Sequence, residues 1–170
     1  TLGRAGHTQA ILTELTKGTL IGFDKDLEAI DYAKSVLDAD RAVLIHDSFS
    51  KIDSTLTNLN IETIDGALFD LGVSSPQFDQ QDRGFSYRFD SKLDMRMDQT
   101  QSLSAYEVVN TYDEDRLEYI LKTYADERFA KAIVKHIIEN RPIHTTFELV
   151  ECIKKGYPGY ALRKGHPAKK

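Results

Sequence analysis

The stretch TLGRAGHTQAIL, residues 1–12, joins a glycine-bearing turn to an apolar pattern with helical spacing. Gly3 and Gly6 let the backbone approach a ligand closely, and the N–H groups at the start of a helix can donate to that ligand. The next apolar run, TLIGFD at residues 19–24, ends in Asp24, about twenty residues further on. An acid at this spacing can bind the two hydroxyls of a ribose. The pattern therefore predicts a nucleoside-containing cofactor, with two plain turn glycines as the alternative.

Two further apolar runs predict strands, AVLIHDSF at residues 42–49 and IDGALFD at residues 64–70. Residues 27–37 and 51–59 lie between the runs and have helical spacing. Strands that alternate with helices, and that are almost continuously apolar, are typical of a parallel sheet covered by helices on both faces. The sequence therefore predicts an α/β fold.

The opening turn favours one class of cofactor over another. A dinucleotide fingerprint needs three glycines as G-x-G-x-x-G, whereas the run here is Gly3-Arg4-Ala5-Gly6-His7-Thr8-Gln9. The third predicted strand ends in Asp70, which adds a carboxylate to the same edge of the sheet, near where a transferable group would sit. We therefore expect methyl transfer from S-adenosylmethionine, with a nucleotide-dependent oxidoreductase as the alternative.

The pattern changes after the third predicted strand. Residues 71–98 have no clear period but contain aromatic residues, methionines, and paired Arg and Asp, which indicates a functional loop. Beyond it the sequence predicts helices at residues 102–109, 113–125, 127–141 and 145–155, the first with Ser104 and Glu107 at capping-box spacing. We expect an α/β domain that binds S-adenosylmethionine at residues 1–98, a helical subdomain at 99–160, and a basic segment at 161–170.

Composition restricts the location and the partners. No apolar stretch approaches the roughly 20 residues that span a bilayer, so we expect a soluble protein. A single cysteine, Cys152, is typical of a reducing compartment and favours the cytoplasm, and its apolar neighbours indicate a core residue. The net charge is −11 through Leu121 and +6 from Lys122 onward. This asymmetry indicates a polyanion partner for the basic part, or charged helices with solvated faces.

Several motifs together resemble one family of enzymes: GRAGH, FDKD, DSF, DLGVSSPQFD, RGFSYR, LDMRMD, ERFAKAI and GHPAKK. They are similar to the bacterial 16S ribosomal RNA cytosine-N4 methyltransferases, along essentially the whole chain. The resemblance implies a Rossmann-like class I methyltransferase sheet with an inserted helical subdomain, acting with S-adenosylmethionine on a cytidine in the decoding region. It implies small-subunit ribosomal RNA or the assembled small subunit as partner, and leaves open a homodimer.

The resemblance also implies the cofactor-binding residues, which are Ala5, Gly6, His7, Asp24, Phe49, Asp70 and Gln77. Asp24 would bind the ribose, Phe49 would cover the adenine, and the opening turn would receive the methionine end. Asp70 would border the methyl group and is the first candidate to accept a hydrogen bond from the cytosine amine. From the residues alone, Phe49 could instead be a core residue and Asp70 a turn residue.

The resemblance adds candidate RNA contacts in the loop and in the basic end. Phe85, with Phe78, Tyr87 and Phe89, offers a stacking surface for a base that has left its stack. The candidates for phosphate contacts are Arg83, Arg88, Arg96, Lys164, Lys169 and Lys170. A non-catalytic RNA-binding module is therefore a further alternative. The histidines have no partners at ligand spacing, so we expect no metal site.

In the resembling family a hydrophobic strand precedes the opening turn and further strands follow GHPAKK, and neither is present in these 170 residues. The cofactor turn of a doubly wound sheet ends a central strand. We therefore expect the chain to be a fragment of a protein nearly twice as long, with unpaired neighbours of that strand. We also expect it to be inactive by itself.

Overall fold

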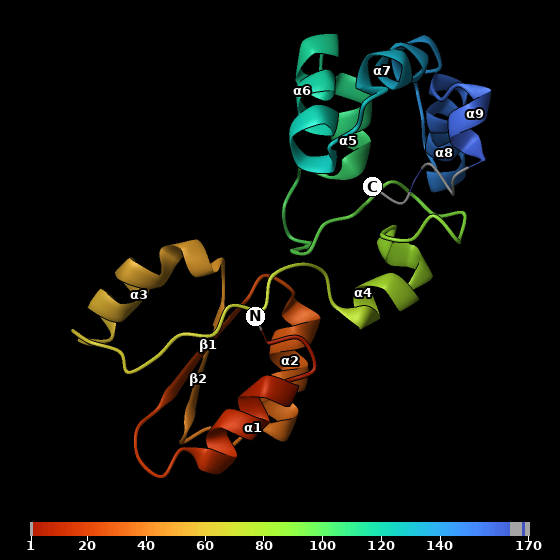
Figure 1. Cartoon of the computed structure of the whole chain (residues 1–170). Helices are drawn as coiled ribbons and strands as arrows, with labels where there is room; N and C mark the ends of the chain where they lie inside the picture. Colours follow the sequence, from red (N-terminus) through yellow and green to blue (C-terminus); the bar gives the residue numbers. More distant parts are fainter. Residues whose placement is uncertain (1, 164–167, 169–170) are drawn as a thin grey trace. The chain divides into compact units, whose positions relative to one another are not determined.

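The computed structural model describes residues 2–163 and 168, which divide into two compact units. The first unit comprises Thr1–Ser74 and Met97–Thr100, and the second comprises Ser75–Arg96 and Gln101–Lys170. Figure 1 draws both units, each of which is described by itself. Among the described residues, no helix is both long and apolar enough to cross a membrane.

The first unit alternates helices and strands, as the sequence predicts. Its elements are α1 (Gly6–Glu14), β1 (Leu20–Asp24), α2 (Leu27–Val36), β2 (Ala42–His46), the 3-10 turn η1 (Phe49–Lys51) and α3 (Ile52–Asn58). The strands β1 and β2 pair in parallel, from Leu20 opposite Ala42 to Asp24 opposite His46. Helix α1 precedes β1, α2 connects β1 to β2, and α3 follows β2 (Figure 1). The predicted α/β class with a parallel sheet is therefore confirmed, at the level of two described strands.

A small core holds the opening turn against the sheet. Its buried members are Leu2, Ala5, Ile30 and Ala33, so the turn packs directly on α2. The Leu2 side chain lies over β1, because a Cβ atom built on Gly22 would be 2.5 Å from the Leu2 Cδ2 atom. The turn is therefore fixed to the strand by packing.

The predicted third strand does not form in these 170 residues. Residues 61–74 contain no helix or strand, and the apolar side chains of Ile64, Leu68 and Phe69 are 47%, 57% and 54% exposed. A strand needs a neighbour that pairs with its N–H and C=O groups, whereas β1 and β2 pair only with each other in the described part of the chain. The burial that the apolar pattern predicts is therefore not observed, and no strand in the described part of the chain pairs with this segment.

The second unit is helical. Its elements are α4 (Ser75–Asp79), the 3-10 turn η2 (Gln81–Arg83), α5 (Ala105–Thr111), α6 (Glu114–Ala125), α7 (Ala130–Glu139), α8 (Thr146–Gly156) and α9 (Gly159–Leu162). The predicted capping box of Ser104 and Glu107 is present, and Thr145 and Glu148 form a second one at the start of α8. The predicted loop at residues 71–98 contains α4 and η2, which are too short to produce a visible period.

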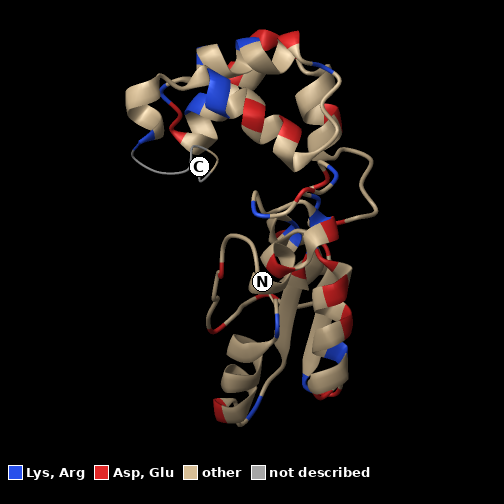
Figure 2. Ribbon diagram, turned by 90° about the vertical axis from the view of Figure 1, so that its right-hand side faces the viewer, with Lys and Arg blue, Asp and Glu red and all other residues tan. Residues whose placement is uncertain are grey.

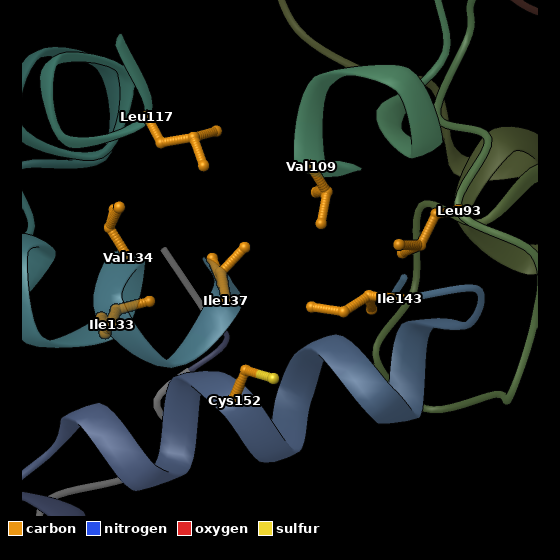
Figure 3. Packing of buried hydrophobic residues seen from close by; sticks show 8 residues of the cluster. All are labelled: Leu93, Val109, Leu117, Ile133, Val134, Ile137, Ile143 and Cys152. Atoms are coloured by element: carbon orange, nitrogen blue, oxygen red, sulfur yellow. The ribbon is translucent and has the colours of Figure 1, made fainter. Parts of the chain in front are cut away.

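One apolar cluster holds these helices together (Figure 3). It consists of Leu93, Val109, Leu117, Ile133, Val134, Ile137, Ile143 and Cys152. Cys152 is 4% exposed, which confirms its expected role in the core, and burial raises the pKa of its thiol. Leu93 belongs to the aperiodic segment, so that segment is attached to the helical core.

Candidate functional site

The carboxyl ends of β1 and β2 meet at one edge of the first unit, because the strands are parallel and Asp24 is opposite His46. This is the edge at which open α/β sheets bind their ligands. The turn η1 follows β2 in the chain, and the opening turn is joined to the end of β1 by hydrogen bonds to Asp24. Groups from separate stretches of sequence therefore gather at this edge.

Asp24 connects the opening turn to the strand. Its Oδ2 atom accepts hydrogen bonds from the backbone N–H groups of Leu2 at 2.9 Å and Gly3 at 3.1 Å. Its Oδ1 atom accepts from the N–H group of Asp26 at 2.9 Å, and the residue is 9% exposed. A carboxylate has about four acceptor positions. Three are used here, so the capacity for one further donor, such as a ribose hydroxyl, remains.

The turn itself has a conformation suited to close approach. Gly3 and Ala5 have φ angles of 51° and 57°, in the left-handed region, and Ala5 is fully buried as the N-cap residue of α1. Alanine in this region costs about 1–2 kcal/mol, which the packing of Ala5 in the small core offsets. No side chain among the described residues caps α1. The first N–H groups of α1, at Gly6 and His7, are therefore suited to an anionic ligand such as a carboxylate.

His7 and Asp70 bring the turn and the 64–70 segment together. The His7 Nδ1 atom lies 3.4 Å from the Asp70 Oδ2 atom, and the two side chains are 68% and 57% exposed. Asp70 therefore lies at the opening turn even though the segment before it is not a strand. An exposed carboxylate beside the cofactor turn can accept a hydrogen bond from an incoming amine.

Phe49 lies at the same edge, at the start of η1. Its ring is 39% exposed and packs edge-on against Phe69, with 5.6 Å between the ring centroids and 78° between the planes. The alternative of a plain core residue is therefore wrong. Sequence reasoning missed Phe69, because the predicted strand assigned it to a buried sheet. A half-exposed aromatic pair can cover one face of a flat heterocycle.

The turn before Phe49 carries a further acid. Asp47 binds Lys51 at 2.8 Å, and this hydrogen bond, with one from the Ser48 N–H group, lowers the pKa of Asp47. Both side chains are exposed, so the pair contributes little to stability. Its effect is to keep a negative charge at the carboxyl edge.

The remaining predicted residues belong to the second unit or lie outside the described residues. Gln77, in α4, is 4% exposed. Arg83 is 1% exposed, Phe85 is half-buried, Arg88 is exposed, and the Arg96 side chain is 26% exposed. Lys164, Lys169 and Lys170 lie outside the described residues. Figure 2 shows basic and acidic residues interspersed over the helices of this unit.

Metal ligation has no candidate in the described part of the chain, since no group of three or more His, Cys, Asp or Glu side chains there could hold an ion. The residues at the carboxyl edge do fit a nucleoside bearing a charged amino-acid group. They offer an acid for hydroxyls, an aromatic face, and helix N–H groups for a carboxylate.

Comparison with known proteins identifies close relatives. The model of the MraW methylase family matches residues 1–170. The chain is 51% identical to "Ribosomal RNA small subunit methyltransferase H" of Lactobacillus delbrueckii subsp. bulgaricus, over 100% of the chain and 58% of that protein. It is 50% identical to proteins of the same name in Lactobacillus johnsonii and Clostridium botulinum, covering 58% and 57% of their lengths. The chain thus spans little more than half of these curated relatives, and it belongs to the MraW methylase family.

Proposed function

We propose that the protein containing this chain transfers a methyl group from S-adenosylmethionine to the N4 amine of a cytidine in the decoding region of small-subunit ribosomal RNA. The observation that carries the proposal is the meeting of the opening turn with Asp24 and Asp70 at one sheet edge. The names of the relatives, which specify small-subunit ribosomal RNA, support the choice of substrate. Either free RNA or the assembled small subunit fits this proposal.

Each residue at the edge would bind a different part of the cofactor. Asp24 would accept a ribose hydroxyl at its remaining acceptor position, and the ring of Phe49 would cover the adenine. The N–H groups of Gly6 and His7 would bind the methionine carboxylate, while Ala5 keeps the turn in shape. Gln77, in the second unit, would border the adenine side, as the family resemblance implies.

Catalysis in this proposal depends mainly on positioning. S-adenosylmethionine supplies a methyl group on a sulfonium, which is already a good leaving group. The N4 amine is a poor nucleophile because its lone pair is delocalised into the ring, so a hydrogen-bond acceptor and an in-line approach help most. Asp70 would accept a hydrogen bond from the amine and hold it in line, so that the N4–CH3 bond forms as the S–CH3 bond breaks and the amine nitrogen gives up one proton. The cytosine must leave its stack to reach Asp70.

The exposed 64–70 segment supports a Rossmann-like sheet larger than the described one. We propose that a strand outside these 170 residues pairs with residues 64–70, because three apolar side chains there are about half exposed. The relatives, which are longer than this chain, have room for such a strand. The same argument supports the expectation that residues 1–170 alone bind the cofactor poorly and show no turnover.

Calorimetry and a methylation assay test this function. Both use a longer protein that contains this chain and has the full length of the curated relatives, called here the protein at the length of its relatives. S-adenosylhomocysteine should bind and NAD should not, and binding of NAD alone would favour an oxidoreductase. RNA binding without any cofactor binding would favour a non-catalytic module.

Asp24→Ala should mainly weaken cofactor binding, whereas Asp70→Ala should abolish most methyl transfer. A loss of cofactor affinity alone in both variants would remove Asp70 from the proposed reaction.

A further inference from the structure

Three arginines of the segment at residues 80–96 have different environments, although their sequence context suggests the same role. Arg83, Arg88 and Arg96 all occur in the motifs RGFSYR and LDMRMD. Arg83 is 1% exposed, the Arg96 side chain is 26% exposed, and Arg88 is exposed. A phosphate contact requires a guanidinium group at the surface, so the three cannot serve equally as phosphate ligands.

Arg83 holds two turns of the segment together from inside. Its Nη2 atom donates to the carbonyl oxygen of Arg96 at 3.1 Å, and its Nη1 atom donates to the Gln80 Oε1 atom at 3.5 Å. Its own carbonyl oxygen accepts from the N–H group of Met95 at 3.0 Å. Arg83 therefore connects the beginning of the segment to its end. The planar fork of a guanidinium can bond two acceptors at once, which an ammonium group does with less geometric precision.

Arg96 is also committed to the segment. It forms a bidentate salt bridge with Asp94, in which the Arg96 Nε atom lies 2.9 Å from Oδ1 and the Nη2 atom lies 2.6 Å from Oδ2. Its Nη1 atom donates to the carbonyl oxygen of Gln101 at 2.6 Å. The hydrogen bonds from Arg96 lower the pKa of Asp94, so the pair stays charged at neutral pH. At least three of the five side-chain N–H donors of Arg96 are thus used within the protein.

The backbone on either side of Arg88 is fixed. Gly84 has a φ angle of 70°, and a Cβ atom there would lie 2.5 Å from the carbonyl oxygen of Lys92, so the chain turns tightly at this point. On the other side, the Thr146 Oγ1 atom donates to the carbonyl oxygen of Phe89 at 2.6 Å, and the N–H group of Leu93 donates to the carbonyl oxygen of His144 at 3.1 Å. Leu93 is buried beside Val109 and Ile143 in the helical core (Figure 3).

Between these fixed points lies a short tip, residues 85–88, which ends in the exposed Arg88 and is followed by Phe89, 39% exposed. Building on the proposed function, we propose that Arg83 and Arg96 are positioning residues that hold this tip in shape, and that Arg88 is the arginine of the segment that contacts the RNA backbone. The exposed ring of Phe89 gives the tip a surface on which a base can stack.

The test compares charge-conserving and charge-removing variants of Arg83 and Arg88 in the protein at the length of its relatives. Binding to transcribed small-subunit RNA is measured over a range of salt concentrations. Arg88→Gln should reduce the slope of log affinity against log salt by about 0.7–0.9, the change expected for one lost phosphate contact, and Arg88→Lys should keep it. Arg83→Met and Arg83→Lys should both weaken binding roughly tenfold with the slope unchanged, because a single charge-assisted hydrogen bond corresponds to about that factor.

Arg83→Lys is the decisive variant. An affinity and slope close to those of the unmodified protein would show that Arg83 acts through its charge, and would overturn the proposal. A reduced slope in Arg83→Met would overturn it as well. An unchanged slope in Arg88→Gln would remove Arg88 from the RNA contact.

Amide hydrogen exchange separates this inference from the proposed function, since it needs no RNA. In Arg83→Met and Arg83→Lys, the amides of Leu93 and Met95 should exchange about ten times faster, while those in the middle of α7 keep their rates. Arg88→Gln should leave all of these rates unchanged. If the unmodified protein binds no RNA, the proposed function and the role of Arg88 fail together, and the exchange rates still decide the role of Arg83. Unchanged exchange at Met95 in both Arg83 variants would overturn that role.

Discussion

At the scale of single residues, Asp24 is the best-defined group of the candidate site. It was predicted as a ribose ligand, and its carboxylate also accepts three backbone N–H groups that fix the turn. Sequence spacing could locate this acid, since position along a strand determines which edge it reaches. The same spacing could not show that most of its acceptor positions are used within the protein.

Asp24→Ala should therefore destabilise the chain as well as weaken cofactor binding. Hydrogen bonds to charged groups contribute about 1.5–3 kcal/mol each, so we expect the loss of three of them to lower the free energy of unfolding in urea by more than about 3 kcal/mol. Asp26→Ala is the matched control, because the Asp26 carboxylate caps α2 by accepting a hydrogen bond from the N–H group of Glu28. That loss should cost about 1 kcal/mol. A smaller effect at Asp24 than at Asp26 would contradict the bridging role.

Tyr157 should give the second unit a dependence on alkaline pH. Burial and the hydrogen bond that its hydroxyl donates to Glu127 raise the pKa of Tyr157 from 10.0 to about 12. The folded state therefore favours the neutral phenol. This contribution to stability is complete below pH 10 and is lost as the pH rises through 12.

The Tm of the unmodified protein should accordingly exceed that of Tyr157→Phe at pH 9, and the difference should shrink as the pH approaches 12. The comparison with Tyr157→Phe is needed because the chain has 8 tyrosines, and this variant isolates the contribution of Tyr157. A difference in Tm that stays constant from pH 9 to 12 would contradict the raised pKa.

At the scale of elements, the sequence predicts correctly the helices and strands whose residue patterns lie within a short stretch of chain. The capping box at Ser104 and the apolar period of α6 depend on nearby residues, and both are present. The strands β1 and β2 are also present, because the chain supplies each with the other as partner across the short connection α2. The strand at residues 64–70 failed because strand formation depends on a distant partner. The short helix α4 was missed because five residues are too few for a period.

Close packing of α7 against α8 gives a sharp test at this scale. A Cβ atom at Gly156 would lie 2.6 Å from the Ile133 Cγ1 atom and 2.7 Å from its backbone nitrogen. Gly156→Ala should lower the free energy of unfolding by about 1–3 kcal/mol, through overpacking. Gly159→Ala is the control, since no atom lies within 4 Å of a Cβ atom there. Equal stability of the two variants in urea would contradict the close contact.

At the scale of the whole molecule, the exposed 64–70 segment predicts a difference between the 170-residue chain and the protein at the length of its relatives. Amides of residues 64–70 should exchange fast in the shorter chain and become protected by at least a factor of about 100 in the longer one, because pairing in a sheet closes them to solvent. The amides of α8 should exchange equally in both and serve as the control. Fast exchange of residues 64–70 in the longer protein would show that they do not form a sheet strand.

The central claim is methyl transfer to a cytosine amine at the edge formed by the opening turn, Asp24 and Asp70. The most direct measurement incubates the protein at the length of its relatives with isotope-labelled S-adenosylmethionine and small-subunit RNA, free or assembled, that lacks the modification. Mass spectrometry of the nucleosides should then find the label in N4-methylcytidine, with most of it lost in Asp70→Ala. Label on another base or at another position, or full transfer by Asp70→Ala, would contradict the account.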